Sequence, residues 1–244
     1  MHRPIHTSLF VIWLTVLTGT QPLPAQQLVE VLGKDGAPMV LVPGGEFLYG
    51  EGENQHRLAL PSFYMDKYEV TTKQYLAFRQ ATGRKERFKV NELIQASEGD
   101  RPIIGVDWQD AEDYCRHYGK RLPTEEEWEK AARGADGRIY PWGDAEPTQA
   151  LASYDWDGKQ RWQGYDNLSP VGAHDAGKSP YGLYDLAGSV TEWTSSEYDF
   201  ETKVVRGGSW LSHPSALRAA HRRGVLPTYR LNALGFRCAQ DARE

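Results

Sequence analysis

The sequence predicts a single α+β domain that is rich in loops, and three observations lead to this fold class. Three segments in the first half carry apolar residues at helical spacing. From Ile139 onward this spacing is lost, and only short strand-like runs remain. The chain also has 8 tryptophans, 24 glycines and 14 prolines, which indicates irregular backbone pinned by aromatic side chains rather than a helical bundle. No internal repeat, low-complexity tract or linker divides the 244 residues.

The first 25 residues are expected to be a secretory signal that precedes this domain. Arg3 supplies a positive start, residues 9–17 form an apolar core, and residues 23–25 read Leu-Pro-Ala, which fits a cleavage site. The alternative is a buried N-terminal helix. The apolar run is too short for a bilayer span, which needs about 20 residues. We therefore expect a periplasmic or secreted protein that begins near Gln26 and has no membrane span.

The mature chain is expected to open with strands, in a domain that covers residues 39–240. Residues 39–50 read as an apolar strand, a turn and a second strand, and residues 63–70 alternate as a third. Thr71 and Gln74 then form a capping box for a first helix. This helix is predicted to end at Gly83, because glycine commonly terminates helices.

Two further helices are expected after a polar loop over residues 84–101. Asp107 caps one that ends at Gly119, and its apolar residues follow the spacing of an amphipathic helix. Thr124 and Glu127 form a second capping box, for a helix that ends at Gly134. The three glutamates at its start complement the helix dipole and are not read as catalytic carboxylates.

The second half is expected to be mostly loop, with little regular structure. Residues 140–143 read as a turn, and residues 158–167 read as an open loop. Residues 204–208 and 234–238 are expected to form short strands.

Charge and cysteine content narrow the classes of function. The net charge of −5 gives no electrostatic basis for binding nucleic acid. Cys115 and Cys238 are the two cysteines of the chain. In an exported protein such a pair is most simply a disulfide, and the alternatives are two buried thiols or a pair of metal ligands.

Ordered motifs along the chain suggest a family. They are Val42-Pro-Gly-Gly-Glu-Phe, Tyr68-Glu-Val-Thr, Arg101-Pro-Ile-Ile-Gly-Val-Asp-Trp, Lys120-Arg-Leu-Pro-Thr-Glu-Glu-Glu-Trp-Glu, Tyr140-Pro-Trp-Gly, Gly182-Leu-Tyr-Asp-Leu-Ala-Gly-Ser-Val-Thr-Glu-Trp, Arg206-Gly-Gly-Ser-Trp and Leu234-Gly-Phe-Arg-Cys. In this order the chain resembles the formylglycine-generating enzymes, or sulfatase-modifying factors, from about Met39 to Cys238. The resemblance implies a large, irregular, C-type-lectin-like fold, and it also implies the disulfide between Cys115 and Cys238.

The resemblance implies one calcium site. Its ligands would be the side chains of Asp185 and Glu192 and the backbone carbonyls of Gly188 and Val190. Carboxylate and carbonyl oxygens are the ligands that calcium prefers. Without the resemblance, the same spacing would indicate only a turn that enters a short strand.

The catalytic motif of the family is not reproduced. Its members oxidise a substrate cysteine to an aldehyde with copper held by two thiolates after Gly-Gly-Ser, and here no cysteine lies between Ser209 and Phe236. Copper(I) selects soft thiolates, so no copper is expected. Thr191 also replaces a tryptophan that is usual in the enzymes. The candidate cleft residues that remain are Ser209, Trp210, Ser212, His213, Arg218 and His221.

Three functions are weighed, and whether the protein is an enzyme stays open. The first is an exported maturation or accessory factor that acts on a peptide, protein or small molecule, similar to family members in pyoverdine maturation or denitrification. The second is a lectin-fold binding module that uses residues 210–230, because loops on a rigid scaffold commonly carry recognition residues. The third is formylglycine generation itself, which would need copper without the cysteine pair. No other catalytic or nucleotide-binding signature is present in the sequence.

Overall fold

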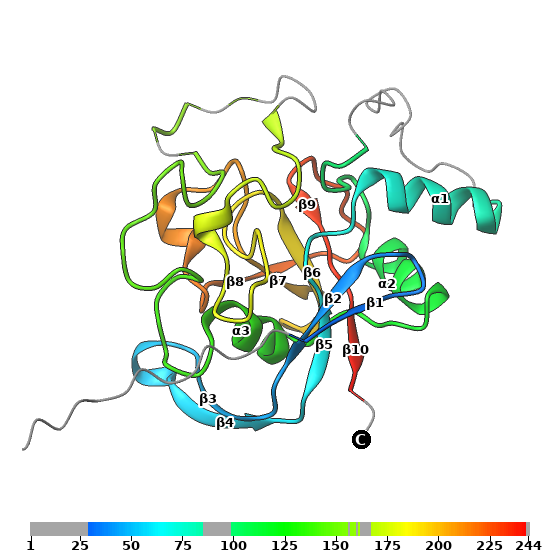
Figure 1. Ribbon diagram of the computed structural model, residues 1–244. Coiled ribbons are helices and arrows are strands. Elements are labelled where there is room, and N and C mark those ends of the chain that lie inside the picture. The colour runs from blue at the N-terminus through cyan, green and yellow to red at the C-terminus, as the bar shows by residue number, and fades with distance from the viewer. Residues whose placement is uncertain (1–28, 85–98, 156, 160, 162–166, 243–244) are drawn as a thin grey trace, which may run out of the picture.

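A computed structural model describes residues 29–84, 99–155, 157–159, 161 and 167–242 (Figure 1). The expected signal, residues 1–25, lies outside these residues, as do most of the polar loop at 84–101 and much of the loop at 158–167. None of the helices in the described ranges is long and apolar enough to cross a membrane.

Two four-stranded sheets frame the domain. The first has the order β1–β2–β5–β10, and the second has the order β8–β7–β6–β9, in which β6 and β9 run parallel. Strands β3 and β4 form a separate hairpin. The strands are β1 Glu30–Leu32, β2 Pro38–Val42, β3 Gly45–Tyr49, β4 His56–Leu60, β5 Phe63–Asp66, β6 Thr191–Glu197, β7 Lys203–Arg206, β8 Arg222–Val225, β9 Leu234–Gly235 and β10 Ala239–Asp241. The predicted loop-rich α+β class is therefore confirmed.

The three expected helices are present with the predicted caps. They are α1 Thr72–Thr82, α2 Trp108–His117 and α3 Glu125–Arg133. Both capping boxes form, and α1 ends at Gly83 in the left-handed conformation. Helices α1 and α2 lie on one side of the molecule, whereas α3 contacts β3, β6 and β7 (Figure 1).

The predicted disulfide is confirmed and lies inside the main hydrophobic cluster. Cys115 of α2 is bonded to Cys238, just before β10, with 5.7 Å between their Cα atoms. Aromatic side chains surround this bond: Tyr114 packs on Phe236 with ring centroids 5.3 Å apart, and Tyr75 of α1 joins the same cluster. The bond therefore joins a helix in the middle of the chain to its last strand.

A buried ion pair joins both sheets and helix α3. The Arg237 guanidinium donates from Nε and Nη2 to the two carboxylate oxygens of Glu192, at 2.7 Å each. The Trp128 indole of α3 donates to the same carboxylate at 2.8 Å. The other guanidinium hydrogens bond the backbone carbonyls of Asp66, Lys67 and Tyr184. Each side chain of the pair is at most 1% exposed, so the partners compensate for each other's loss of water.

Removal of the disulfide should lower the free energy of unfolding. Replacing both Cys115 and Cys238 with alanine frees a loop with a sequence separation of 123 residues. The chain-entropy model gives a loss of about 4–5 kcal/mol for a loop of this length. Urea denaturation of the two forms measures the difference, and thiol titration of the denatured, unreduced protein should find no free thiol. Unchanged stability would contradict the expectation.

Arg237→Met should be far more damaging than loss of an exposed arginine. The substitution leaves the Glu192 carboxylate buried without its counter-charge, which costs about 3–5 kcal/mol. Arg57→Met is the matched control, because Arg57 and Glu46 form an ion pair with side chains 72% and 63% exposed. Exposed pairs contribute about 0–1 kcal/mol. Equal urea midpoints for the two variants would refute the role assigned to Arg237.

Candidate functional site

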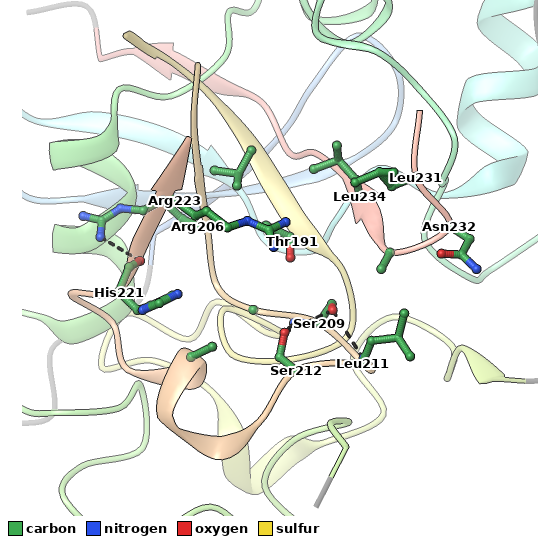
Figure 2. Close-up of a pocket in the computed structure, with 14 residues that line it drawn as sticks. Thr191, Arg206, Ser209, Leu211, Ser212, His221, Arg223, Leu231, Asn232 and Leu234 are labelled. Atoms are coloured by element: carbon green, nitrogen blue, oxygen red, sulfur yellow. Dashed lines mark hydrogen bonds between the residues drawn. The ribbon is translucent and has the colours of Figure 1, made fainter. Parts of the chain in front are cut away.

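A cavity of about 320 Å³ lies between the second sheet and the segment that follows β7 (Figure 2). Residues from β6, β7, β8 and β9 form one side, and two loops close the other. The lining consists of Thr191, Val205, Arg206, Gly208, Ser209, Leu211, Ser212, Ala216, His221, Arg223, Leu231, Asn232, Ala233 and Leu234. A cavity of this size suits a small ligand or one or two residues of a peptide.

A double-glycine turn positions two hydroxyl groups at the cavity wall. Gly207 and Gly208 have φ angles of 92° and 67°, which side chains with a Cβ rarely adopt. A Cβ on Gly208 would also lie 2.9 Å from the carbonyl oxygen of Ala216. The turn places the Ser209 amide 2.9 Å from Ser212 Oγ, and the two hydroxyl oxygens lie 3.2 Å apart.

His221 lies on the opposite side of the cavity, and its ring points toward these hydroxyls (Figure 2). Burial lowers the pKa of His221, and the positive charges of Arg218, Arg206 and Arg223 lower it further. The neutral imidazole is therefore favoured, and a neutral imidazole can accept a proton or a hydrogen bond. Its ring bonds neither serine hydroxyl in the structure, so no serine nucleophile paired with a histidine base is formed.

Three of the six predicted cleft residues line this cavity: Ser209, Ser212 and His221. Trp210 does not, because its ring is only 2% exposed and packs in a small core cluster that includes Val190. Its indole nitrogen donates to the backbone carbonyl of Asn232, so it supports the wall from behind.

His213 and Arg218 also lie outside the cavity lining. The exposed His213 ring accepts a hydrogen bond from the Ser215 amide, and so caps the short helix η6, Pro214–Leu217. Arg218 donates to Glu51 at 2.9 Å, and both side chains are more than 40% exposed. The sequence places both residues in the right segment, but only the path of the turn decides which side chains face inward.

Thr191, where the enzymes usually have a tryptophan, lines the cavity at the start of β6. Residues from three other segments also line it and were not predicted: Arg206, Arg223 and Asn232. The predicted strand at 204–208 already contains Arg206, but Arg223 lies in β8, which the sequence does not reveal.

Three of the four expected calcium ligands lie on a strained, buried turn that leads into β6, and the fourth, Glu192, lies in β6 itself. Asp185 has a φ of 58°, and its carboxylate accepts a hydrogen bond from the Gly172 amide at 2.6 Å. Gly188 has a φ of 81°, and a Cβ there would lie 2.2 Å from the carbonyl oxygen of Ser153. Glu192 already shares its carboxylate with Arg237 and Trp128.

Glu69 is a buried neighbour of this turn that the sequence reasoning missed. Its carboxylate accepts hydrogen bonds from the Ser189 hydroxyl at 3.0 Å and from the Val190 amide at 3.1 Å. Burial raises the pKa of Glu69 well above its ordinary value, and the negative charges of Asp185 and Glu192 raise it further. The one feature of the sequence that could have pointed to Glu69 is its place in the Tyr-Glu-Val-Thr motif.

The chemistry of the turn fits an oxygen-liganded divalent cation. The carboxyl groups of Glu69, Asp185 and Glu192 are buried close to one another and to the Arg237 guanidinium. Burial raises the pKa of Glu69 and of Asp185, and a bound cation would stabilise their ionised forms. Within the described ranges, no three histidine, cysteine or acidic side chains converge to hold a metal ion, so backbone carbonyls would have to complete the site.

Both cysteines are consumed by the disulfide, and neither lines the cavity. The lining therefore contains no pair of thiolates of the kind that copper(I) prefers.

Comparison with known proteins supports the resemblance seen in the motifs. Residues 25–242 match the model of the sulfatase-modifying factor enzyme 1-like domain. A Bos taurus protein named inactive C-alpha-formylglycine-generating enzyme 2 is 43% identical over 156 residues, which cover 58% of this chain and 50% of that protein. The formylglycine-generating enzyme of Mus musculus is 30% identical over 280 residues, which cover 83% of this chain and 75% of the enzyme.

A solved structure supports the fold. PvdO from Pseudomonas aeruginosa matches with a TM-score of 0.71 and 23% identity, over 91% of this chain and all of that chain. The chain spans half or less of the first curated relatives that it matches. Together with the ordered motifs and the loop-rich architecture, the family match leads to one conclusion: this chain belongs to the family of sulfatase-modifying factor enzyme 1-like domains.

Proposed function

We propose that this protein is a maturation or accessory factor that binds a peptide or small molecule in the cavity bounded by Ser209, Ser212 and His221. The observation that carries the proposal is the chemistry of the lining, which offers hydroxyl, imidazole and guanidinium groups but no thiolate. Such groups can bind and orient a ligand, whereas they cannot hold cuprous copper in the manner of the family's oxidases. The similarity to a relative named as an inactive formylglycine-generating enzyme supports the same reading.

A binding module is the second candidate, and the rim of the cavity favours it. Leu211, Tyr229 and Leu231 are 39%, 49% and 38% exposed, and two of them line the cavity mouth. Exposed aromatic and aliphatic side chains beside a pocket are common in protein recognition. In this case residues 210–230 would display a surface for a protein partner, and the cavity would receive one of its side chains.

An oxidising compartment is also part of the proposal. The disulfide between Cys115 and Cys238 supports it, because such bonds persist mainly in exported proteins. The signal-like residues 1–25 support periplasmic or secreted placement in the same way.

The purified protein should not convert cysteine to formylglycine. It would be loaded with copper(I) and incubated with oxygen and a sulfatase-type cysteine peptide, and aldehyde would be sought by mass spectrometry. The mouse formylglycine-generating enzyme is the positive control. We expect no aldehyde above the level without protein, since no thiolate pair faces the cavity. Copper-dependent aldehyde formation would overturn the proposal.

Calcium is proposed as a structural ion at Asp185, Gly188, Val190 and Glu192. The cluster of buried carboxyl groups at this turn supports it, and the ion would fix the entry to β6 without taking part in chemistry. A ligand bound only to the native state stabilises it by about 2.7 kcal/mol at 100 times its Kd. A calcium chelator should therefore lower the Tm, and added calcium should restore it.

Asp185→Gly tests the location of this ion, because glycine accepts the φ of 58° and removes the carboxylate. The variant should lose the calcium dependence of its Tm. Glu201→Gln, which removes an exposed carboxylate between β6 and β7, is the control and should keep it. A wild-type Tm that is the same with calcium and with chelator would refute the site.

A further inference from the structure

The cavity lining has no acidic side chain, although the protein as a whole is acidic. The net charge of the chain is −5, yet the fourteen lining residues include two arginines and a histidine and no aspartate or glutamate. The cavity therefore differs in charge from the rest of the molecule. A cavity that is lined by cationic side chains and lacks acidic ones attracts anionic ligands.

Arg206 is already neutralised on the far side of the sheet. Its Nη1 donates to the His221 carbonyl at 3.0 Å, and its Nη2 makes a buried ion pair with Glu129. Its guanidinium also lies over the Trp128 ring, 5.7 Å from the centroid. Arg206 thus belongs to the interface with α3, and its charge is satisfied there.

The Arg223 side chain lies on the cavity face of the sheet, opposite to that of Arg206. It stands opposite Val205 in the β7–β8 pairing, so the two side chains share the face that lines the cavity. In Figure 2 its guanidinium extends toward Thr191. No hydrogen bond or ion pair engages it among the described residues. The next residue, Arg222, points to the other face and pairs with Glu125 at 2.8 Å.

The wall around Arg223 combines free polar groups with an apolar surface. The side chains of Thr191 and Asn232 also lack a hydrogen-bond partner within the described part of the chain. Leu211, Leu231 and Leu234 supply apolar surface beside them. A ligand that fits both would carry an acidic group at one end and an aliphatic part at the other.

We propose that the cavity binds a carboxylate, which is held by the Arg223 guanidinium with the Thr191 hydroxyl, while the aliphatic part of the ligand packs on the three leucines. The inference deepens the proposed function, on which it rests, by naming the chemical class of the ligand. A guanidinium binds a carboxylate through two parallel hydrogen bonds. A monoanion matches the charge, because the Arg223 guanidinium faces the cavity without a partner among the described residues, whereas the charge of Arg206 is already balanced.

His221 adds a second, adaptable contact. Burial and three arginines lower its pKa, so the neutral ring is present before the ligand arrives and can donate one hydrogen bond to it. The carboxylate can come from the C-terminus of a peptide or from a free small acid, since both present the same group.

Calorimetric titration with matched probes tests the inference. N-acetyl-leucine carries the carboxylate, and N-acetyl-leucinamide has nearly the same shape without the charge. We expect the acid to bind at least tenfold more tightly than the amide. A peptide that ends in a free leucine distinguishes the sources: tighter binding than N-acetyl-leucine points to a peptide C-terminus, and weaker binding points to a small acid.

Variants on the two faces of β8 provide the internal control. Arg223→Gln should weaken binding of N-acetyl-leucine at least tenfold, and Arg223→Lys should recover part of it. Arg222→Gln should bind within threefold of the wild type, and the Tm of Arg223→Gln should be nearly unchanged because its side chain makes no hydrogen bond or ion pair with the described residues. Equal binding of acid and amide, or normal binding by Arg223→Gln, would overturn carboxylate recognition alone. Failure of all probes to bind at millimolar concentration would overturn the proposed function as well.

Discussion

The fold depends on the burial of one guanidinium whose hydrogen bonds are all satisfied. Arg237 bonds Glu192 in β6 and the backbone carbonyls of Asp66, Lys67 and Tyr184. A buried guanidinium is stabilised when its donors find acceptors, and these five bonds require the segments to come together in one geometry. Because β6 also carries Thr191, the same constraint fixes one wall of the cavity.

The arrangement separates the scaffold from the chemistry that it supports. The disulfide, the Arg237 network and the turn before β6 hold the framework, and the side chains of Ser209, Ser212, His221 and Arg223 make none of these bonds. Different sets of side chains can therefore line the cavity without loss of the fold. In this chain the lining has hydroxyls, an imidazole and the Arg223 guanidinium, which suits ligand binding more than oxygen activation.

The sequence predicted the helices well, because their signals are local. Capping boxes at Thr71 and Thr124 and glycines after the last turn mark the ends within one or two residues. Strand β8 was missed because Arg222–Val225 has three polar or small residues and gains its structure only by pairing with β7. The site shows the same division. Ser209 and Ser212 were predicted from the segment that begins with the Gly-Gly-Ser motif. The inward position of Arg223 depends on the long-range register of β8 against β7, and the outward position of His213 depends on a turn that no local pattern specifies.

Strands β9 and β10 have a consequence for the order of events during synthesis. Within residues 234–241 the chain supplies a parallel partner to β6, the sulfur that bonds α2 and an edge strand beside β5. A nascent chain that still lacks these residues can form its helices and hairpin but cannot complete either sheet. The core can therefore close only after residues 234–241 have emerged from the ribosome, and its closure carries the cost of long-range loop closure.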